Sequence, residues 1–184
     1  MVKGLLVVLA IVIGTERMLE LRLAGRNRRL ILARGGQECG QSHYRWVILL
    51  HSAWFVAWLA EAFARGPHLP GLWPVWLALF LLAEALRYWC ITTLGVRWNT
   101  RILVIPGAPL VRSGPYRWLR HPNYLAVVTD LFAVPMIFNA WITALAFTVL
   151  NLALLLFVRI PAEEKALKRA QEPQGNPKEV GCGS

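Results

Sequence analysis

Acidic residues and cysteines are scarce in this chain, and each shortage excludes some kinds of protein or binding site. It has 10 aspartates and glutamates against 20 lysines and arginines, and charged residues make up only 16% of its 184 positions. The three cysteines are widely spaced, with no Cys-x-x-Cys pair and no histidine at metal-ligand spacing, so we expect no bound metal. Gly-x-Gly-x-x-Gly and Walker motifs are also missing, so any nucleotide-like ligand would have to be held by a different structure.

Hydrophobic residues, in contrast, make up 57% of the chain, which includes nine tryptophans. A soluble domain of this composition would expose a large apolar surface, and tryptophan is enriched where membrane proteins meet the bilayer interface. We therefore expect an integral membrane protein with the lipid bilayer as its partner. The net charge of +10 could indicate nucleic-acid binding, but the arginines adjoin hydrophobic spans and form no separate basic face. We expect contact with anionic lipid and no nucleic acid.

Five apolar segments predict an all-α integral membrane protein with about five transmembrane helices. The first segment would be about 18 Å long as a helix, short of the roughly 30 Å hydrocarbon core, and can be extended along the interface to Leu23. It has no substantial basic leader and no small-residue cleavage site, which favours a retained helix over a signal peptide. The five segments are residues 2–13, 46–63, 72–94, 124–138 and 141–158.

The last two segments are separated only by Asn139 and Ala140, which predicts a tight helical hairpin. Pro135, near the tip, is expected to kink or end the first arm because proline cannot donate a helical hydrogen bond. We expect residues 1–170 to form one membrane-embedded domain. Residues 171–184 are polar and rich in glycine and proline, and we expect them to be a disordered tail.

Basic residues predict the orientation of the spans. Only Lys3 and Arg65 fall on one side, and nearly all the others fall on the other side. The positive-inside rule then places the N-terminus outside and the polar loops and the tail in the cytoplasm. The basic residues assigned to the cytoplasm are Arg17, Arg22, Arg26, Arg28, Arg29, Arg34, Arg45, Arg97, Arg101, Arg112, Arg117, Arg120, Arg159, Lys165, Lys168, Arg169 and Lys178.

The polar segment from Arg112 to Tyr124, with the sequence RSGPYRWLRHPNY, lies between the third and fourth spans. It is longer than most helix connections need to be, and its two prolines restrict the backbone. Such a segment can hold backbone N–H groups and the His121 imidazole in fixed directions, which suits a polar ligand at a membrane surface. A second polar motif, Arg159-Ile-Pro-Ala-Glu-Glu164, follows the last span.

These motifs together resemble the isoprenylcysteine carboxyl methyltransferase family. The resemblance covers roughly residues 17–167, with a weaker matching part at residues 94–109. It implies a methyltransferase of the bacterial inner membrane that uses S-adenosylmethionine at a cytoplasmic site. By resemblance, Arg159 and Glu163 would be catalytic, close to the transferred methyl group. The residues that would bind the cofactor are Tyr116, His121, Pro122, Asn123, Tyr124 and Glu164.

The residues themselves leave the methyl acceptor open. Arg159 could hold a carboxylate through a bidentate pair, which favours an isoprenylcysteine-like, prenylated or other amphiphilic lipid. Glu163 or His121 could instead remove the proton of a phenolic or enolic hydroxyl on a long-chain polyketide lipid. Phospholipid N-methylation and a non-enzymatic lipid-binding scaffold are further alternatives. Arg159 and Glu163 are four residues apart, so on a helix they could form a pair with each other in the empty site.

Ionisable residues inside the predicted spans are expected to be paired, because an isolated charge there is costly. Glu84 and Arg87 are three residues apart and are predicted to pair with each other. Asp130 is predicted either to face the pocket or to be paired structurally. The chain lacks the aromatic-rich terminal helix that is common in the family, so we expect the loop of residues 26–45 to cover the cofactor pocket.

Overall fold

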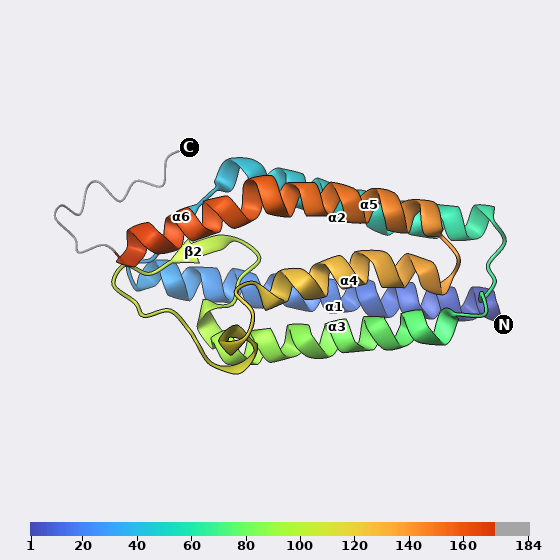
Figure 1. The fold of residues 1–184 in the computed structure, drawn as a ribbon, viewed down its shortest axis with the longest axis horizontal. Coiled ribbons are helices and arrows are strands. Elements are labelled where there is room, and N and C mark those ends of the chain that lie inside the picture. The colour runs from blue at the N-terminus through green and yellow to red at the C-terminus, as the bar shows by residue number, and fades with distance from the viewer. Residues whose placement is uncertain (172–184) are drawn as a thin grey trace.

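The computed structural model describes residues 1–171, so the predicted disordered tail lies outside the described residues apart from Gln171. Helices α1 to α5 lie along one another in a long bundle and correspond to the five predicted segments (Figure 1). In chain order the elements are α1 (Val2–Ala33), β1 (Gln37–Cys39), α2 (Gln41–Ala64), α3 (Trp73–Leu94), η1 (Gly95–Arg97), β2 (Ile102–Val104), η2 (Gly114–Arg117), α4 (Pro122–Ile137), α5 (Trp141–Leu154), η3 (Leu155–Arg159) and α6 (Ile160–Gln171).

Three helices are long and apolar enough to cross a membrane. They are α2, the continuous helix of α3 and η1 (Trp73–Arg97), and the continuous helix of α5, η3 and α6 (Trp141–Gln171). The integral membrane class is therefore confirmed. Helix α4 is apolar but has 16 residues, about 24 Å at 1.5 Å per residue. Helix α1 has 32 residues and carries charged residues in its middle, so the count of five spans stays a prediction.

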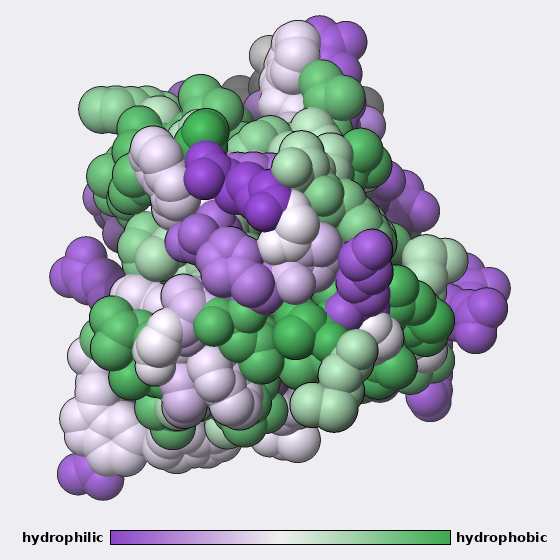
Figure 2. Space-filling view, turned by 90° about the vertical axis from the view of Figure 1, so that its right-hand side faces the viewer, coloured by the Kyte–Doolittle hydropathy of each residue, from purple (hydrophilic) through white to green (hydrophobic). Residues whose placement is uncertain are grey.

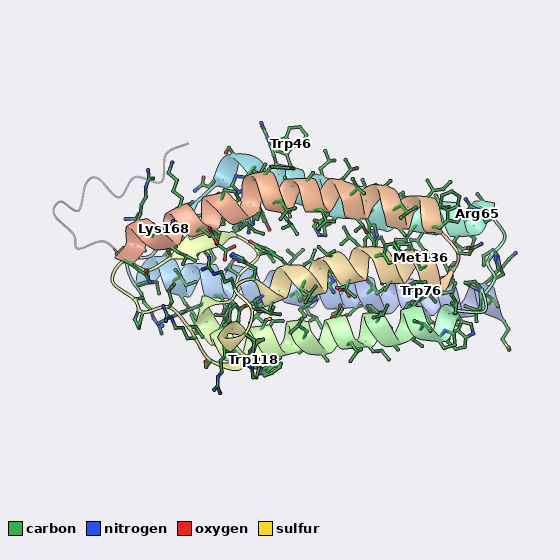
Figure 3. All side chains as sticks on the ribbon, in the orientation of Figure 1. Trp46, Arg65, Trp76, Trp118, Met136 and Lys168 are labelled. Atoms are coloured by element: carbon green, nitrogen blue, oxygen red, sulfur yellow. The ribbon has the colours of Figure 1, made fainter. Side chains whose placement is uncertain are left out.

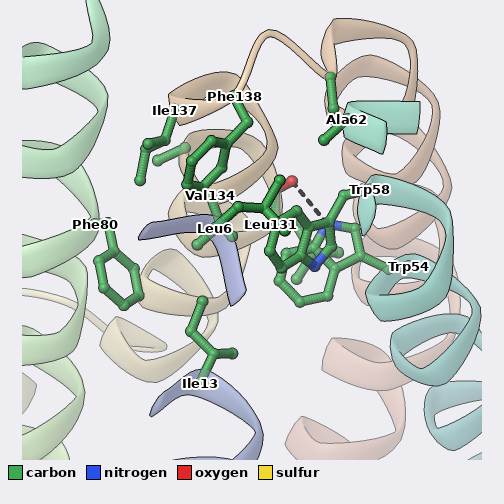
Figure 4. Close-up of a cluster of buried hydrophobic side chains, with 12 residues drawn as sticks. Leu6, Ile13, Trp54, Trp58, Ala62, Phe80, Leu131, Val134, Ile137 and Phe138 are labelled. Carbon is green, nitrogen blue, oxygen red and sulfur yellow. Dashed lines mark hydrogen bonds between the residues drawn. The ribbon is translucent and has the colours of Figure 1, made fainter. Parts of the chain in front are cut away.

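The half of the bundle near the N-terminus is packed around aromatic rings (Figure 4). Trp58 of α2 and Phe138, at the end of α4, are fully buried, and their rings stack with centroids 6.1 Å apart. The Trp54 indole N–H donates to the carbonyl of Leu131 at 3.0 Å, as the dashed line in Figure 4 shows. Because this bond satisfies the one polar atom of the Trp54 ring, it fixes α2 against α4 within an apolar core.

The α4–α5 hairpin is as tight as predicted. Helix α4 ends at Ile137, two residues after Pro135, and the Ala140 N–H donates to the Pro135 carbonyl at 2.9 Å. Glu61 of α2 satisfies the first turn of α5, because one of its carboxylate oxygens accepts bonds from the N–H and the hydroxyl of Thr143, both at 2.7 Å. The side chain therefore caps the helix from a neighbouring element and fixes the tip of the hairpin to α2.

The opposite end of the bundle contains a short antiparallel sheet, which corrects the expectation of a purely helical fold. Strand β1 pairs with β2, and Glu38 lies opposite Leu103. Helix α1 continues to Ala33, so only a turn and β1 remain of the loop predicted over residues 26–45. Helix α6 lies on the sheet, with Ala166 and Ala170 packed in one buried cluster with the strand residues. The sheet and α6 form a common cover at this end.

Basic side chains lie at both ends of the molecule. Lys168 lies at the end that carries the sheet, and Arg65 lies at the other end (Figure 3). Figure 2 shows the latter end face-on, with hydrophilic side chains gathered at its centre and apolar side chains around them. The polar segment that the sequence analysis singled out belongs to the sheet end, since η2 and the start of α4 lie there (Figure 1).

Candidate active site

A cavity of about 580 Å³ begins beneath the sheet and extends into the bundle. Its polar end is lined by residues of the β2 region, η2, the start of α4 and the start of α6. Its inner part is lined by apolar residues such as Phe80, Leu131 and Val134. This size lies within the usual range for small-molecule sites, roughly 300–1,000 Å³. The cavity therefore joins a polar chamber to an apolar one.

Turn η2 is held against α3 at a position where only glycine fits. Gly114 has a φ of +54°, and a Cβ there would lie 2.4 Å from the Thr93 hydroxyl oxygen. This close packing places Tyr116 in the cavity wall beside Cys90. Burial raises the pKa of Tyr116, and the Cys90 thiol raises it further, so the hydroxyl is protonated at neutral pH.

His121 and Pro122 start α4 and direct Tyr124 into the cavity. His121 is the N-cap, and Pro122 occupies the first turn, where its missing N–H costs no helical hydrogen bond. The rings of His121 and Tyr124 stack with centroids 5.5 Å apart. The Nε2 atom of His121 lies 3.5 Å from Glu164 Oε1, and its Nδ1 lies 3.9 Å from Glu163 Oε1. Two glutamates of α6 therefore face one imidazole.

Tyr124 connects the two predicted catalytic residues. Its hydroxyl donates a hydrogen bond to Glu163 Oε2 and accepts one from Arg159 Nε at 3.3 Å. Arg159 Nη2 donates to the Thr100 carbonyl at 2.5 Å. Arg159 and Glu163 do not form the direct ion pair predicted from their spacing, because the Tyr124 hydroxyl lies between them and bonds to both. Arg159 Nη1 is buried and has no hydrogen-bond partner within residues 1–171.

The eight predicted site residues all lie at this end of the bundle. Those that line the cavity are Tyr116, His121, Asn123, Tyr124, Arg159 and Glu163. Pro122, the first residue of α4, is buried but does not line the cavity. Glu164 also lies outside the wall and contacts His121, with Arg120 Nη1 3.8 Å away. Their roles in binding and catalysis stay predictions.

Three residues next to the sheet, which were not predicted as site residues, also line the polar end of the cavity. Thr100 and Arg101 precede β2, and Tyr44 follows β1. The Arg101 guanidinium lies over the Tyr44 ring, 4.1 Å from its centroid. Glu38 accepts hydrogen bonds from Arg101 Nη1 at 2.5 Å and Arg28 Nε at 2.6 Å. Burial alone would raise the pKa of Glu38, but the two arginines outweigh it and lower the pKa below its ordinary value.

A cluster of charged side chains lies deeper in the bundle, where α1, α3 and α4 meet. Glu84 pairs with Arg87 at 3.4 Å, as predicted, and Arg87 also bonds to Asp130. Arg17 of α1 lies 2.5 Å from Glu84 and 3.5 Å from Asp130, so its side chain, which is 30% exposed, turns toward the bundle and not wholly to the wet side of the helix as predicted. Glu20 completes the cluster through Arg17, at 2.6 Å. Asp130 is therefore both paired and part of the cavity wall.

Two further polar residues of the cavity wall escaped the sequence analysis. His51 on α2 and Asn151 on α5 line the cavity, although each lies in an otherwise apolar span. The signal that could have found them is the isolated polar residue itself. Such residues are rare in spans and commonly face a cavity or a functional pathway.

The fold and the cavity define a membrane protein with a polar site at one end of an apolar chamber. Residues 76–169 match the Isoprenylcysteine carboxyl methyltransferase (ICMT) family, and the chain belongs to this family of membrane methyltransferases. The chain is 38% identical to the Uncharacterized protein YpbQ of Bacillus subtilis (strain 168) over 153 residues, which are 83% of this chain and 90% of that protein. It is 28% identical to an uncharacterized protein of Haemophilus influenzae over 152 residues, 82% of this chain and 88% of that one. No solved structure matches the chain.

Proposed function

We propose that the protein is an S-adenosylmethionine-dependent O-methyltransferase that acts on the carboxylate of an isoprenylcysteine-like or other amphiphilic lipid. The observation that carries this proposal is the unpartnered Nη1 of Arg159, a buried cationic donor in the cavity wall. A buried guanidinium N–H without a partner is costly, and an acceptor carboxylate would satisfy it through a charge-assisted hydrogen bond. The apolar inner chamber would hold the lipid chain of the same molecule.

The polar end also fits the cofactor. Asn123 Oδ1 is buried, lines the cavity and lacks a hydrogen-bond partner among the described residues, so it can accept a bond from an amino group. Glu163 and Glu164 supply negative charge for the ammonium and sulfonium groups, and the stacked rings of His121 and Tyr124 offer an aromatic face. When bound, S-adenosylmethionine supplies an electrophilic methyl group on a sulfonium.

In this proposal, the residues of the site act mainly by holding the two reactants in place, and acid–base catalysis is not needed. A carboxylate is already ionised at neutral pH, so it needs no base to become a nucleophile. Arg159 would hold one acceptor oxygen, while its bonds to Thr100 and Tyr124 keep the guanidinium from turning. Correct placement of two reactants can supply on the order of 7–11 kcal/mol of the barrier reduction. The cover of sheet and α6 would exclude bulk water from the polar end.

A second candidate is O-methylation of a phenolic or enolic hydroxyl on a long-chain lipid. The Glu163 carboxylate favours it, because this group accepts a bond from the Tyr124 hydroxyl and lies 3.9 Å from His121 Nδ1. A phenol has a pKa near 10 and needs a base to lose its proton at neutral pH. Glu163, with His121 beside it, could take that proton.

We also propose that the site faces the cytoplasm of a bacterial inner membrane. The basic loops and the cavity's polar end share one end of the bundle, opposite Arg65 (Figure 3). Positive charge near spans is retained on the cytoplasmic side, which is also where a soluble cofactor is available.

Product analysis tests the proposal. Purified protein in detergent is incubated with methyl-labelled S-adenosylmethionine and a bacterial lipid extract, and the labelled lipids are treated with mild alkali. A methyl ester releases labelled methanol, and this is the expected result. An alkali-stable labelled ether would instead support the phenol or enol acceptor. Cofactor binding without any labelled lipid would contradict both candidates. Arg117→Lys, an exposed change outside the cavity wall, serves as the matched control for Arg159→Lys.

A further inference from the structure

Two of the buried side chains that line the inner part of the cavity each carry a polar atom without a hydrogen-bond partner among the described residues. Asp130 on α4 is 4% exposed, and Asn151 on α5 is 1% exposed. Asp130 Oδ1 and Asn151 Nδ2 have no hydrogen-bond partner in the described part of the chain, although both residues line the cavity. The opposite oxygen of Asp130 is bonded to Arg87, and the Asp130 carboxyl also faces Glu84, so Asp130 lies between the charged cluster and the cavity. The cavity wall therefore offers a ligand one hydrogen-bond acceptor, on Asp130, and one donor, on Asn151.

Helices α2, α4 and α5 each contribute one polar side chain to the inner part of the cavity. We name this group, His51, Asp130 and Asn151, the inner polar belt. The bond between Trp54 and Leu131 places residues 51–54 of α2 beside residues 130–131 of α4. Asn151 lies at a similar height because α4 and α5 are antiparallel arms of one tight hairpin. His51 Nδ1 bonds to the Val47 carbonyl at 2.8 Å, which makes Nδ1 the donor and leaves Nε2 as an acceptor.

The belt lies a short way below the proposed site of methyl transfer. Asp130 follows Tyr124 by six residues, about 9 Å along the helix, and Asn151 precedes Arg159 by eight residues, about 12 Å. Helical side chains tilt toward the N-terminus of their own helix, so Arg159 tilts toward the level of Asn151. Because the arginine side chain is much longer than that of asparagine, its guanidinium can approach the belt more closely than the backbone interval. The separation suits two functional groups on the head of one amphiphile.

The charges around the belt select the kind of group it can bind. Arg17 and Arg87 already face three acidic side chains, those of Glu20, Glu84 and Asp130, so neither cation is left without an acidic partner. A second anion on the ligand would find no unmatched cation there. A hydroxyl both donates and accepts, so it matches the free oxygen of Asp130 as well as the N–H of Asn151. A methylene group would match neither atom.

We propose that the inner polar belt binds a hydroxyl on the head of the methyl acceptor, so that the substrates are hydroxylated amphiphiles and not plain lipid acids. This inference rests on the proposed function, since Arg159 would hold the methylated group while the belt holds the hydroxyl. Sites that hydrogen-bond a substrate hydroxyl discriminate strongly against analogues that lack it, by up to about 10⁴-fold or more. The belt is therefore a specificity determinant for the acceptor.

Binding of two matched probes tests the proposal. The probes are 3-pentadecylbenzoate and 3-hydroxy-5-pentadecylbenzoate, which differ by one ring hydroxyl, and affinity is measured by calorimetry on the whole protein in detergent without cofactor. We expect the hydroxylated probe to bind at least tenfold more tightly to the wild type. In Asn151→Leu the ratio should fall to about threefold or less, while affinity for the plain probe is kept. Retained binding of the plain probe shows that the variant is folded, and Asn151→Ala replaces it if it is not.

Thr148→Val is the matched control. Thr148 is also on α5, and its buried hydroxyl also has no partner within residues 1–171, but it does not line the cavity. The affinity ratio should therefore stay at its wild-type value in this variant. Equal affinities for the two probes in the wild type would show that the belt holds only water and would overturn the inference, as would an unchanged ratio in the Asn151 variants. Methyl transfer to each probe is measured separately. Hydroxyl selectivity without transfer would contradict only the proposed function.

Discussion

Replacing Arg159 by lysine tests the proposed carboxylate acceptor most directly. The guanidinium uses Nη2 and Nε to reach Thr100 and Tyr124, which leaves Nη1 for the acceptor. A lysine ammonium cannot make all three contacts, because its donors radiate from one atom and not from a planar fork. Hydrogen bonds to charged groups are worth about 1.5–3 kcal/mol each. Losing one such bond in the transition state predicts a fall of roughly 10- to 100-fold in kcat/KM.

The assay must separate turnover from cofactor binding. Steady-state methyl transfer gives kcat and KM for the acceptor, and calorimetry gives the affinity for S-adenosylmethionine. We expect Arg159→Lys to lose turnover while cofactor affinity stays within about threefold, and Arg117→Lys to behave like the wild type. If the acceptor is a carboxylate, Glu163→Gln should be tolerated better than Arg159→Lys. For a phenol the order should invert, because Glu163 would then be the base. Unchanged turnover in both variants would refute the placement of catalytic residues at the junction of η3 and α6.

Three other predictions follow from the same structure. His121→Ala or Tyr124→Ala should weaken S-adenosylmethionine binding by tenfold or more in calorimetry, and wild-type affinity in both would remove this segment from the cofactor site. Single cysteines at Val2 and Ser184 in a cysteine-free background should be labelled from outside and inside the cell respectively, and external labelling of position 184 would reverse the orientation. Because the folded-state pKa of Glu38 is lowered, its contribution to stability is present above its ordinary value of 4.5 and is lost as the pH falls through the lowered pKa. The protection of the β1 amides against hydrogen exchange, relative to the intrinsic rate at each pH, should therefore fall in acid, and Glu38→Gln should lower that protection at neutral pH and remove the pH step.

The sequence predicted helices α2 to α5 well because their apolar runs are long and their ends are marked, whereas α1 continues to Ala33, ten residues beyond its predicted extension to Leu23. The Asn139–Ala140 connection is too short for anything except a hairpin, and the hairpin is present. Glu84 and Arg87 pair as their spacing predicted. The sequence also predicted that the two polar motifs lie on the same side of the membrane. In the structure, residues of both motifs contact each other around Tyr124. Local pattern was sufficient in these cases.

Features that depend on contacts between distant segments were not predicted. Strands of three residues are too short to show an alternating pattern, so the sheet left no signal. Arg17 was assigned to the wet side of an interfacial helix because charges usually lie there, whereas its partner Glu84 is 67 residues away and turns its half-buried side chain toward the bundle. His51 and Asn151 were overlooked because one polar residue hardly lowers the hydrophobicity of a span. Only the packing of α2, α4 and α5 shows that both residues meet a common cavity.

The π-helical turn η3 joins the membrane helix α5 to α6 without a break. A π turn contains one more residue than the α-helical turn it replaces, and each residue advances an α-helix by about 100°. Deleting one residue from η3 would therefore rotate α6 by about that angle relative to α5. Glu163 would leave the cavity wall, and the alanine face of α6 would leave the sheet. Proteins that keep this site can vary in the sequence of the turn far more freely than in its length.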